Sequence, residues 1–495
     1  MTDIKYAWSA LGGDPARLAR LTTVEREGAL EARLPVPQLA RACVGVCALA
    51  AAELAARRAG LAAVPGVEID DGAVATAFHS ERLLRIDGRA PVAFAPLSRF
   101  WRTADGWVRT HANYPHHRSR LLGALGLPAD PAVRDVAARF AELPALAAEE
   151  AVHRAGGLAV ALRTPQEWRA HEQGAEVAAR PLVERERPET SRPRELPPPA
   201  PATTPLLPAA GLRVLDLTRV LAGPVATRTL AVLGADVLRV DAPWLPELPD
   251  LHADTGFGKR SATLDLGSGR DRFEELLGSA DVVVTGYRPG ALDRFGLAPE
   301  ALIARRPGLV VAQVSAWGAY GPWAGRRGFD SLVQAATGIS VTEGSAGEPG
   351  ALPAQALDHG TGYLLAAAVL RALTERSYDG HGRCVRLALA RTAHWLTDGI
   401  RPAPAPGAPY EGPHARPAGA SGPLGPPARV AGTPYEGPDA WLAETDGPLG
   451  RLRHALSPVS FAGGPAGRTR PPVPWGSDTA RWGAGEEAGP VRDRW

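Results

Sequence analysis

The stretch 211–398 alternates short apolar strand patterns with helical patterns, and this alternation restricts the fold more than any other feature of the chain. Parallel strands need long crossover connections, which are usually helices, so the alternation predicts an α/β fold. We expect a doubly wound parallel sheet with helices on both faces. Such sheets bind ligands beyond the carboxyl ends of their strands. The expected strands are 214–217, 235–240, 262–266, 281–285 and 309–315, and the expected site loops are 219–224, 286–290 and 317–321.

The 495 residues exceed one ordinary core, so more than one domain is expected. Residues 1–183 show an α+β pattern, and dense proline marks 184–210 as an extended linker. The α/β region occupies 211–400, and 401–495 reads as a Pro/Gly-rich connection followed by a loose tail. Within the first region the expected helices are 36–58 and 131–147, and the expected strands are 83–86, 94–97 and 107–110.

Composition excludes several classes of function. The 55 basic and 53 acidic residues nearly balance, which gives no nucleic-acid-binding signature. The three cysteines have no disulfide or zinc spacing, which is typical of a reducing cytoplasm. No signal-like segment and no apolar stretch of membrane-spanning length is expected, so we predict a cytoplasmic protein without a membrane partner. His111, His116 and His117 lie close together without a carboxylate or cysteine at ligand spacing, so no metal is expected.

One carboxylate stands at a conspicuous place in the second region. Asp358 lies within ALDHGTG (356–362), immediately before an apolar helical pattern at 363–373. Taken alone, Asp358 is best explained as the N-cap of that helix. Other generic motifs fail: residues 256–260 lack phosphate-loop spacing, and no Gly-x-Ser-x-Gly segment occurs.

Read together, several segments resemble the class III CoA-transferases, the formyl-CoA and carnitine CoA-transferase type of the CaiB/BaiF superfamily. The pieces follow one another in family order and at family spacing, which makes the set far more specific than any one of them. They are RVLAGP (219–224), LGADVLRVDAP (233–243), GKRSATLDL (258–266), ADVVVTGYRPG (280–290), LDRFGL (292–297), VSAWGAYGP (314–322), GFDSLVQAATG (328–338) and LDHGTG (357–362).

The resemblance implies a Rossmann-like large domain, a smaller α+β domain and long linkers. It assigns Asp358 as the nucleophile that moves CoA from an acyl-CoA to a small carboxylic acid through aspartyl anhydride and aspartyl-CoA intermediates. Coenzyme A is then a substrate, and no permanent cofactor is implied. Gly360 and Gly362 would allow the pantetheine arm close to the backbone and leave N–H groups for oxyanions. The implied CoA-binding residues are Val220, Leu221, Lys259, Arg260, Gly286, Tyr287 and Arg294.

The chain departs from the family pattern in two places that bear on function. Gly286-Tyr287 replaces a usual Asn-Phe, and Ala242 stands where some members carry a basic residue. The related α-methylacyl-CoA racemases use a His in a Gly-His-Asp segment, whereas this chain has Phe329 there. A racemase or isomerase, with His359 as a substitute, stays open as an alternative. A non-catalytic CoA-binding protein is the other alternative.

The first region resembles only part of the family. Residues 40–60 echo the helix after Asp358 but place Arg41 or Ala42 opposite the nucleophile, so this half-copy has none. Residues 91–183 resemble the family's small domain. We therefore expect a rearranged, partly duplicated transferase, in which the helix at 40–56 packs near that at 363–373. Both regions would complete one CoA site with Asp358 at their border, leaving a homodimer optional.

Overall fold

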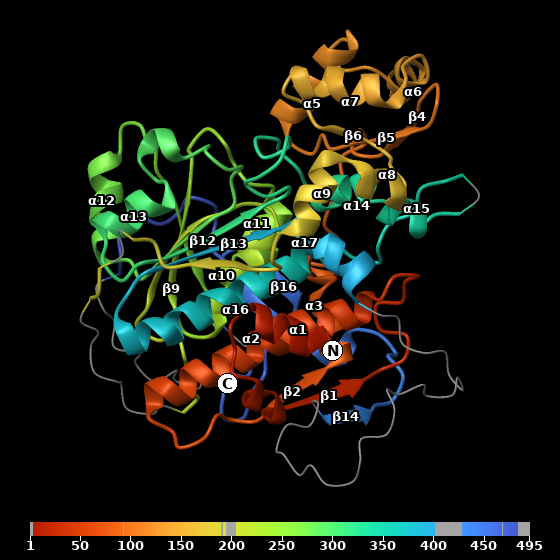
Figure 1. Cartoon of the computed structure of the whole chain (residues 1–495). Helices are drawn as coiled ribbons and strands as arrows, with labels where there is room; N and C mark the ends of the chain where they lie inside the picture. Colours follow the sequence, from red (N-terminus) through yellow and green to blue (C-terminus); the bar gives the residue numbers. More distant parts are fainter. Residues whose placement is uncertain are drawn as a thin grey trace.

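The computed structural model describes residues 3–92, 94–189, 192–194, 204–345, 347–400, 428–467 and 469–483. Its centre is a seven-stranded sheet in the order β10-β9-β8-β11-β12-β13-β7 (Figure 1). All neighbouring pairs are parallel except β13 and β7. The strands are β8 (Arg213–Leu217), β9 (Asp236–Asp241), β10 (Lys259–Thr263), β11 (Val282–Thr285), β12 (Val310–Ser315), β13 (Arg383–Ala388) and β7 (Glu184–Glu186).

The expected parallel sheet is confirmed, and its strand order shows where a ligand would bind. Counted along the chain from β8, the six parallel strands lie in the order 3-2-1-4-5-6. The order reverses between β8 and β11, and open α/β sheets bind ligands in the crevice at that point. The sequence did not predict β13 or β7. The linker expected at 184–210 therefore begins with an edge strand that pairs with β13.

Helices cover both faces of this sheet because its strands are apolar on both sides. The side chains of Val214 and Leu215, adjacent on β8, enter separate cores on opposite faces. Helices α10 and α16 contribute to the first core, and α12 and α13 contribute to the second. The helices of this region are α10 (Ala222–Val232), α11 (Pro249–Thr255), α12 (Arg270–Ser279), α13 (Pro299–Arg305), α14 (Asp330–Ala336), α15 (Ile339–Thr342), α16 (Ala356–Asp379) and α17 (Leu389–His394).

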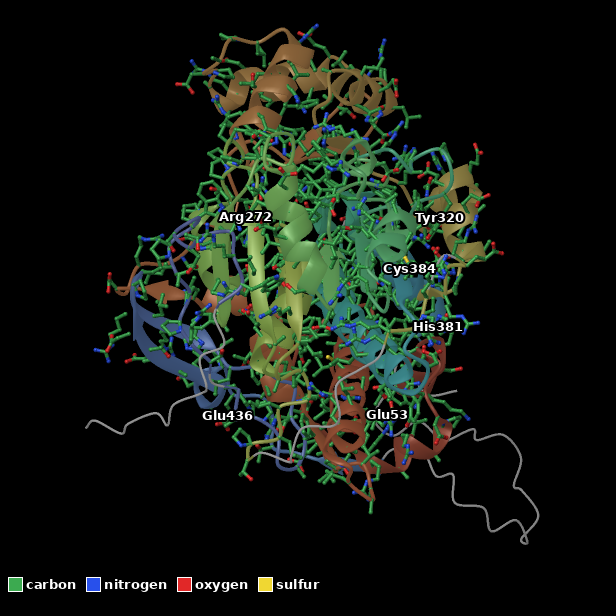
Figure 2. The ribbon with its side chains drawn as sticks, turned by 90° about the vertical axis from the view of Figure 1, so that its left-hand side faces the viewer. Glu53, Arg272, Tyr320, His381, Cys384 and Glu436 are labelled. Atoms are coloured by element: carbon green, nitrogen blue, oxygen red, sulfur yellow. The ribbon has the colours of Figure 1, made fainter. Side chains whose placement is uncertain are left out.

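Two long buried helices join the first region to the second. Helix α2 (Val36–Ala59) packs against α16, as expected, and the two lie side by side in Figure 1. Glu53 of α2, labelled in Figure 2, ion-pairs with Arg371 of α16. No apolar stretch of membrane-spanning length was expected from the sequence, but α2 is long and apolar enough to cross a bilayer. Its apolar window is 94% buried inside the protein, which explains the composition by core packing.

The middle of the first region forms a small lobe, drawn in orange and yellow at the top of Figure 1. It has its own core and a three-stranded sheet in the order β4-β5-β6. The helix expected at 131–147 is two helices, because Pro144 interrupts the pattern. Residues 94–97 are not a strand. The lobe contains β4 (Phe100–Arg102), β5 (Trp107–Thr110), α5 (Pro115–Leu125), α6 (Val133–Ala141), α7 (Ala145–Arg154) and β6 (Ala159–Ala161), followed by α8 (Pro165–Ala170) and α9 (Glu172–Ala179).

The two ends of the chain share sheets. Strand β1 pairs in parallel with β2 on one side and with β14 on the other, and β16 pairs with β3. The carboxyl-terminal part was expected to be loose, but residues 470–478 hydrogen-bond along β10. Residues 401–427 and 484–495 lie outside the described residues. The remaining elements are α1 (Asp3–Ala10), β1 (Leu21–Glu25), β2 (Val67–Asp70), α3 (Asp71–Ala77), α4 (Ser80–Leu83), β3 (Arg85–Ile86), β14 (Ala428–Ala431), β15 (Leu442–Gly447) and β16 (Gly450–Ala455).

Candidate active site

Asp358 is the third residue of α16, in its first turn. Its side chain does not cap this helix, because no hydrogen bond joins either carboxylate oxygen to another of the described residues. The residue is only 6% exposed. The N-cap explanation is therefore wrong, and a nearly buried carboxylate is left without a donor.

The cap of α16 comes from a different helix. Asp330, the first residue of α14, accepts the backbone N–H groups of Leu357 and Asp358 at 2.9 and 3.0 Å. Its other oxygen accepts a hydrogen bond from Gln334, whose amide oxygen in turn accepts from Leu352 N at 2.9 Å. A carboxylate that bonds to the free N–H groups of a first turn stabilises that helix end. This network fixes the backbone on which the Asp358 side chain stands.

The two aspartates influence each other's protonation. Burial raises the pKa of Asp358 well above its usual value, and the charges of Asp330 and Glu81 raise it further. Burial also raises the pKa of Asp330 to about 6, against the opposing effect of its hydrogen bonds. Two buried carboxylates close together cannot both ionise readily. The charge on Asp330 therefore opposes the ionisation of Asp358.

The first region supplies a third carboxylate to this site. Glu81 Oε2 lies 3.0 Å from Nε2 of His359, the residue after Asp358. Burial alone would raise the pKa of Glu81, but the hydrogen bond and charge of His359 outweigh burial and lower it. The Phe78 ring stacks on His359 with 5.3 Å between centroids. Residues from both regions therefore meet at Asp358, and His359 is held by Glu81.

The two glycines after Asp358, which were expected to admit pantetheine, lie where α16 packs against neighbouring helices. Both lie inside α16 and are buried. A Cβ on Gly362 would lie 2.6 Å from the Ala222 carbonyl oxygen of α10, and one on Gly360 would lie 3.5 Å from Cys43 Sγ of α2. A side chain at position 362 would therefore collide with α10, whereas one at position 360 would make an ordinary contact with α2.

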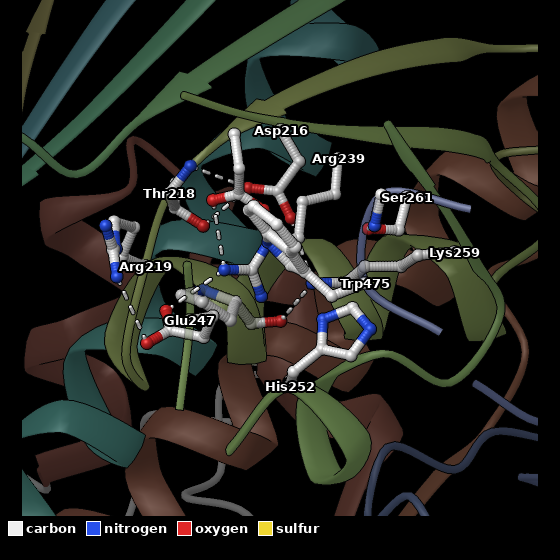
Figure 3. Close-up of polar contacts among 12 residues, drawn as sticks. Asp216, Thr218, Arg219, Arg239, Glu247, His252, Lys259, Ser261 and Trp475 are labelled. Atoms are coloured by element: carbon white, nitrogen blue, oxygen red, sulfur yellow. Dashed lines mark hydrogen bonds and ion pairs between the residues drawn. The ribbon is translucent and has the colours of Figure 1, made fainter. Parts of the chain in front are cut away.

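Lys259, which was expected to bind a CoA phosphate, is buried among partners of its own domain. It is 2% exposed, and its ammonium donates to Asp216 Oδ2 at 2.9 Å, to Pro224 O at 3.0 Å and to Thr227 Oγ1 at 2.6 Å (Figure 3). Burial lowers the pKa of Lys259 to about 8, against the charge of Asp216. All three ammonium donors are used inside the protein. A phosphate partner role for Lys259 is not supported by this arrangement.

The other implied CoA residues lie in three places: Arg260, a second group of four residues, and Arg294. Arg260 follows Lys259 at the amino end of β10 and is paired with Asp236 at 2.7 Å. The second group lies at the carboxyl ends of β8 and β11, where the strand order reverses. Arg294, on the loop after β11, is exposed and stacks over Phe295 at 4.6 Å. The second group consists of Val220, Leu221, Gly286 and Tyr287.

A buried charge network braces this second group. The Val220 N–H donates to Glu247 Oε2 at 2.9 Å, and Val220 has a φ of 69°, a left-handed conformation that β-branched residues rarely adopt. Burial alone would raise the pKa of Glu247, but the charges of Arg239 and Arg219 hold it at about 2. Tyr114 of the small lobe donates to the same carboxylate. The strained turn is thus fixed by residues of both regions, and Figure 3 shows Glu247 with Arg219 and Arg239.

The small lobe also touches the segment that carries Asp330. The His111 imidazole lies flat on the Phe329 ring, with centroids 3.7 Å apart and planes 2° apart. Burial and the charge of Arg109 lower the pKa of His111 to about 3, so this ring is neutral. Among the described residues, no group of three or more His, Cys, Asp or Glu could hold a metal ion.

Sequence reasoning missed two residues of this site. Asp330 belongs to the segment 328–330, which was noted only because its middle residue is phenylalanine. Its role depends on a contact across 28 positions that no local pattern reveals. Glu81 lies in the first region, where no motif singled it out.

Comparison with known proteins agrees with the sequence resemblance. Residues 209–443 match the model of CoA-transferase family III. This part of the chain, just under half of its length, is therefore similar to CoA-transferase family III. The match spans the six parallel strands of the central sheet, α16 and Asp358.

Two curated relatives are named as transferases of acetyl-CoA and of CoA. The chain is 32% identical over 330 residues to the acetyl-coenzyme A transferase nodX of Hypoxylon pulicicidum, covering 62% of this chain and 55% of that protein. It is 37% identical over 193 residues to the formyl-CoA:oxalate CoA-transferase of Streptomyces coelicolor, covering 36% and 47%. The chain thus spans about half the length of the curated relatives it matches.

Solved structures of similar sequence are also known. A crystal structure of Rv3272 from Mycobacterium tuberculosis is 33% identical, with 39% of this chain and 57% of that chain covered and a TM-score of 0.36. A CAIB/BAIF family protein from Brucella suis is 31% identical, with 39% and 59% covered and a TM-score of 0.36.

Proposed function

We propose that the chain is a class III CoA-transferase that moves CoA between an acyl-CoA and a small carboxylic acid, with Asp358 as nucleophile. The observation that carries the proposal is the Asp358 carboxylate: it is nearly buried, accepts no hydrogen bond from the described residues, and stands on a backbone fixed by Asp330. Such a carboxylate is unsuited to a structural role and is free to form a covalent bond.

In the proposed reaction, Asp358 loses its proton and attacks the thioester carbonyl carbon, which breaks the C–S bond. CoA leaves as a thiolate, and an acyl-aspartyl anhydride remains. The thiolate then attacks the aspartyl carbonyl carbon, so the first acid departs as a carboxylate and an aspartyl-CoA thioester forms. The second acid attacks the carbonyl carbon of this thioester, which releases the thiolate and forms a second anhydride. The thiolate then attacks the new acyl carbonyl carbon, which gives the new acyl-CoA and restores the Asp358 carboxylate.

The same contacts support a site that one chain completes by itself. Glu81 and His111 of the first region reach His359 and Phe329 of the second. The strand order supports a Rossmann-like domain with its ligand crevice near Val220. The three free buried cysteines are compatible with the proposed cytoplasmic location. A homodimer is not required by this arrangement.

Covalent trapping tests the proposal. Intact mass would be measured after incubation with a panel of acyl-CoAs, followed by peptide mapping and hydroxylamine treatment. We expect a hydroxylamine-sensitive acyl or CoA adduct on Asp358, and none in Asp358→Asn, whose exchange activity should fall by several orders of magnitude. Asp281→Asn, which changes a buried aspartate just before β11, should keep the adduct.

The alternatives predict other outcomes. A racemase would exchange the α-hydrogen of an acyl-CoA with solvent and leave no adduct. The racemase alternative is less well supported, because the Phe329 side chain cannot transfer a proton and His359 is hydrogen-bonded to Glu81. A non-catalytic protein would bind CoA without adduct or exchange. Full exchange activity in Asp358→Ala would refute the assignment of the nucleophile.

A further inference from the structure

Residues 470–482, called the C-terminal strap, run along β10 and lie outside the part of the chain that the family model matches. The Gly258 N–H donates to the Arg470 carbonyl oxygen at 2.9 Å, and the Asp478 N–H donates to the Ser261 carbonyl oxygen at 2.7 Å. Such contacts cover the free backbone groups of an edge strand. Edge cover needs only these backbone contacts, but one side chain of the strap reaches farther into the central domain.

That side chain is Trp475, which lies at the carboxyl end of β9. Its indole Nε1–H donates to Asp241 Oδ2 at 3.0 Å (Figure 3). Asp241 is the last residue of β9 and also accepts two hydrogen bonds from Arg239, at 2.7 and 3.2 Å. The indole therefore holds one oxygen of the carboxylate that orients the Arg239 guanidinium.

The same guanidinium continues the chain of contacts to the crevice of the sheet. Arg239 Nη2 donates to Glu247 Oε2 at 3.0 Å, and this oxygen also accepts the Val220 N–H at 2.9 Å. The three charged side chains in this series are almost completely buried, with exposed fractions of 2% for Asp241, 1% for Arg239 and 6% for Glu247. They connect Trp475 with the turn after β8.

The turn at Val220 depends on such support. Its φ of 69° is a conformation that persists in a β-branched residue only where the surrounding contacts hold it. The half-buried indole of Trp475 also helps to keep water from Asp241, and charges attract more strongly where water is excluded. Val220 follows β8 where the strand order reverses, which is the position at which open α/β sheets bind ligands.

We propose that Trp475 is a positioning residue of the CoA site, which holds the turn at Val220 in its binding conformation through the three buried charges. This inference rests on the proposed function. The nucleophile depends on other contacts, because Asp330 fixes the backbone of Asp358. Loss of the indole N–H therefore weakens CoA binding and leaves the covalent step at saturating acyl-CoA unchanged.

Two tryptophan variants of the full chain test the inference. Trp475→Phe keeps an aromatic ring but removes the N–H, and calorimetric titration should show CoA binding weakened by about fivefold or more. Trp482→Phe is the matched control, because Trp482 belongs to the same strap but donates its Nε1–H to the Leu276 carbonyl oxygen at 2.9 Å. Its CoA affinity should stay within about twofold of the wild-type value. The rate of adduct formation at saturating acyl-CoA should be the same in both variants.

Amide hydrogen exchange of the segment 219–223 measures the turn without any ligand. In Trp475→Phe the Val220 amide should exchange about tenfold faster or more, and in Trp482→Phe it should exchange at the wild-type rate. A double-mutant cycle shows whether Trp475 acts through Asp241. Trp475→Phe should weaken CoA binding less in an Asp241→Asn background than in the wild type.

The alternative is that the strap only covers the sheet edge. In that case both tryptophan variants lower the free energy of unfolding, while CoA affinity and Val220 exchange stay at the wild-type values, and this result would overturn the inference. Fully additive losses in the double-mutant cycle would also overturn it. A wild-type chain that binds no CoA would refute the proposed function. Exchange at Val220 then decides the role of Trp475 by itself, since an unchanged rate in Trp475→Phe contradicts it and a faster rate supports it.

Discussion

Replacing Asp330 by asparagine should change the pH at which Asp358 becomes reactive. Asparagine keeps an oxygen that can accept the N–H groups of Leu357 and Asp358, but it removes the negative charge beside the nucleophile. That charge is the second cause, after burial, of the raised pKa of Asp358. Without it, Asp358 should ionise at lower pH.

The expected shift follows from the proximity of the two groups. Unit charges 4 Å apart interact by about 4 kcal/mol at an effective dielectric constant near 20, and less at longer separation. Since about 1.4 kcal/mol corresponds to one pKa unit, loss of the Asp330 charge should lower the pKa of Asp358 by at most about three units. The acid limb of kcat/KM against pH, which reports ionisation in the free enzyme, should move down by the same amount.

Stability gives an independent measure with a defined sign. Burial raises the pKa of Asp330 to about 6 from 3.8, so between these values the native state holds a proton that the unfolded state has lost. The free energy of unfolding of the wild type should therefore decrease as pH rises from about 4 to 6. This decrease should be smaller in Asp330→Asn. It is measured by urea unfolding at several pH values.

A control separates charge near Asp358 from buried charge in general. Asp281, just before β11, is 8% exposed and accepts hydrogen bonds from Arg213 N and Arg376. Asp281→Asn should lower stability and leave the acid limb in place. An unchanged acid limb in Asp330→Asn would refute the electrostatic reasoning, provided the variant unfolds cooperatively.

Two further predictions concern packing and buried charge. Gly362→Ala should lower the free energy of unfolding by about 1–3 kcal/mol, because its Cβ would meet the Ala222 carbonyl oxygen. Gly360→Ala should leave the free energy of unfolding unchanged or raise it by up to about 1 kcal/mol. Equal stabilities of the two variants in chemical denaturation would contradict this prediction. Lys259→Met should cost about 3–5 kcal/mol, because Asp216 loses its buried partner. The CoA affinity of the folded Lys259→Met protein should stay at the wild-type value. A weakened affinity without loss of stability would instead show that Lys259 binds CoA.

Apolar strands could be predicted from the sequence, but charged strands and long-range contacts could not. Strand β11 is a run of valines, and strand β8 is apolar except for Arg213 and Asp216, so the position of both followed from the pattern alone. Strand β13 was missed because Arg383 and Arg386 interrupt its apolar pattern, although both are held by acidic partners. The ordered motifs located Asp358, whereas the Lys259–Asp216 pair spans 43 positions and left no local signal.

The shared sheets of the two chain ends affect how the protein is made. Strand β1 ends at Glu25, but its neighbour β14 starts only at Ala428. At about 5–20 residues per second, a ribosome needs roughly 20–80 s to synthesise the intervening chain. During that time the nascent chain carries α2, whose mean hydropathy reaches 1.7, before its partner α16 has emerged. The amino-terminal sheet is therefore among the last parts of the molecule that can close, although its first strand leaves the ribosome early.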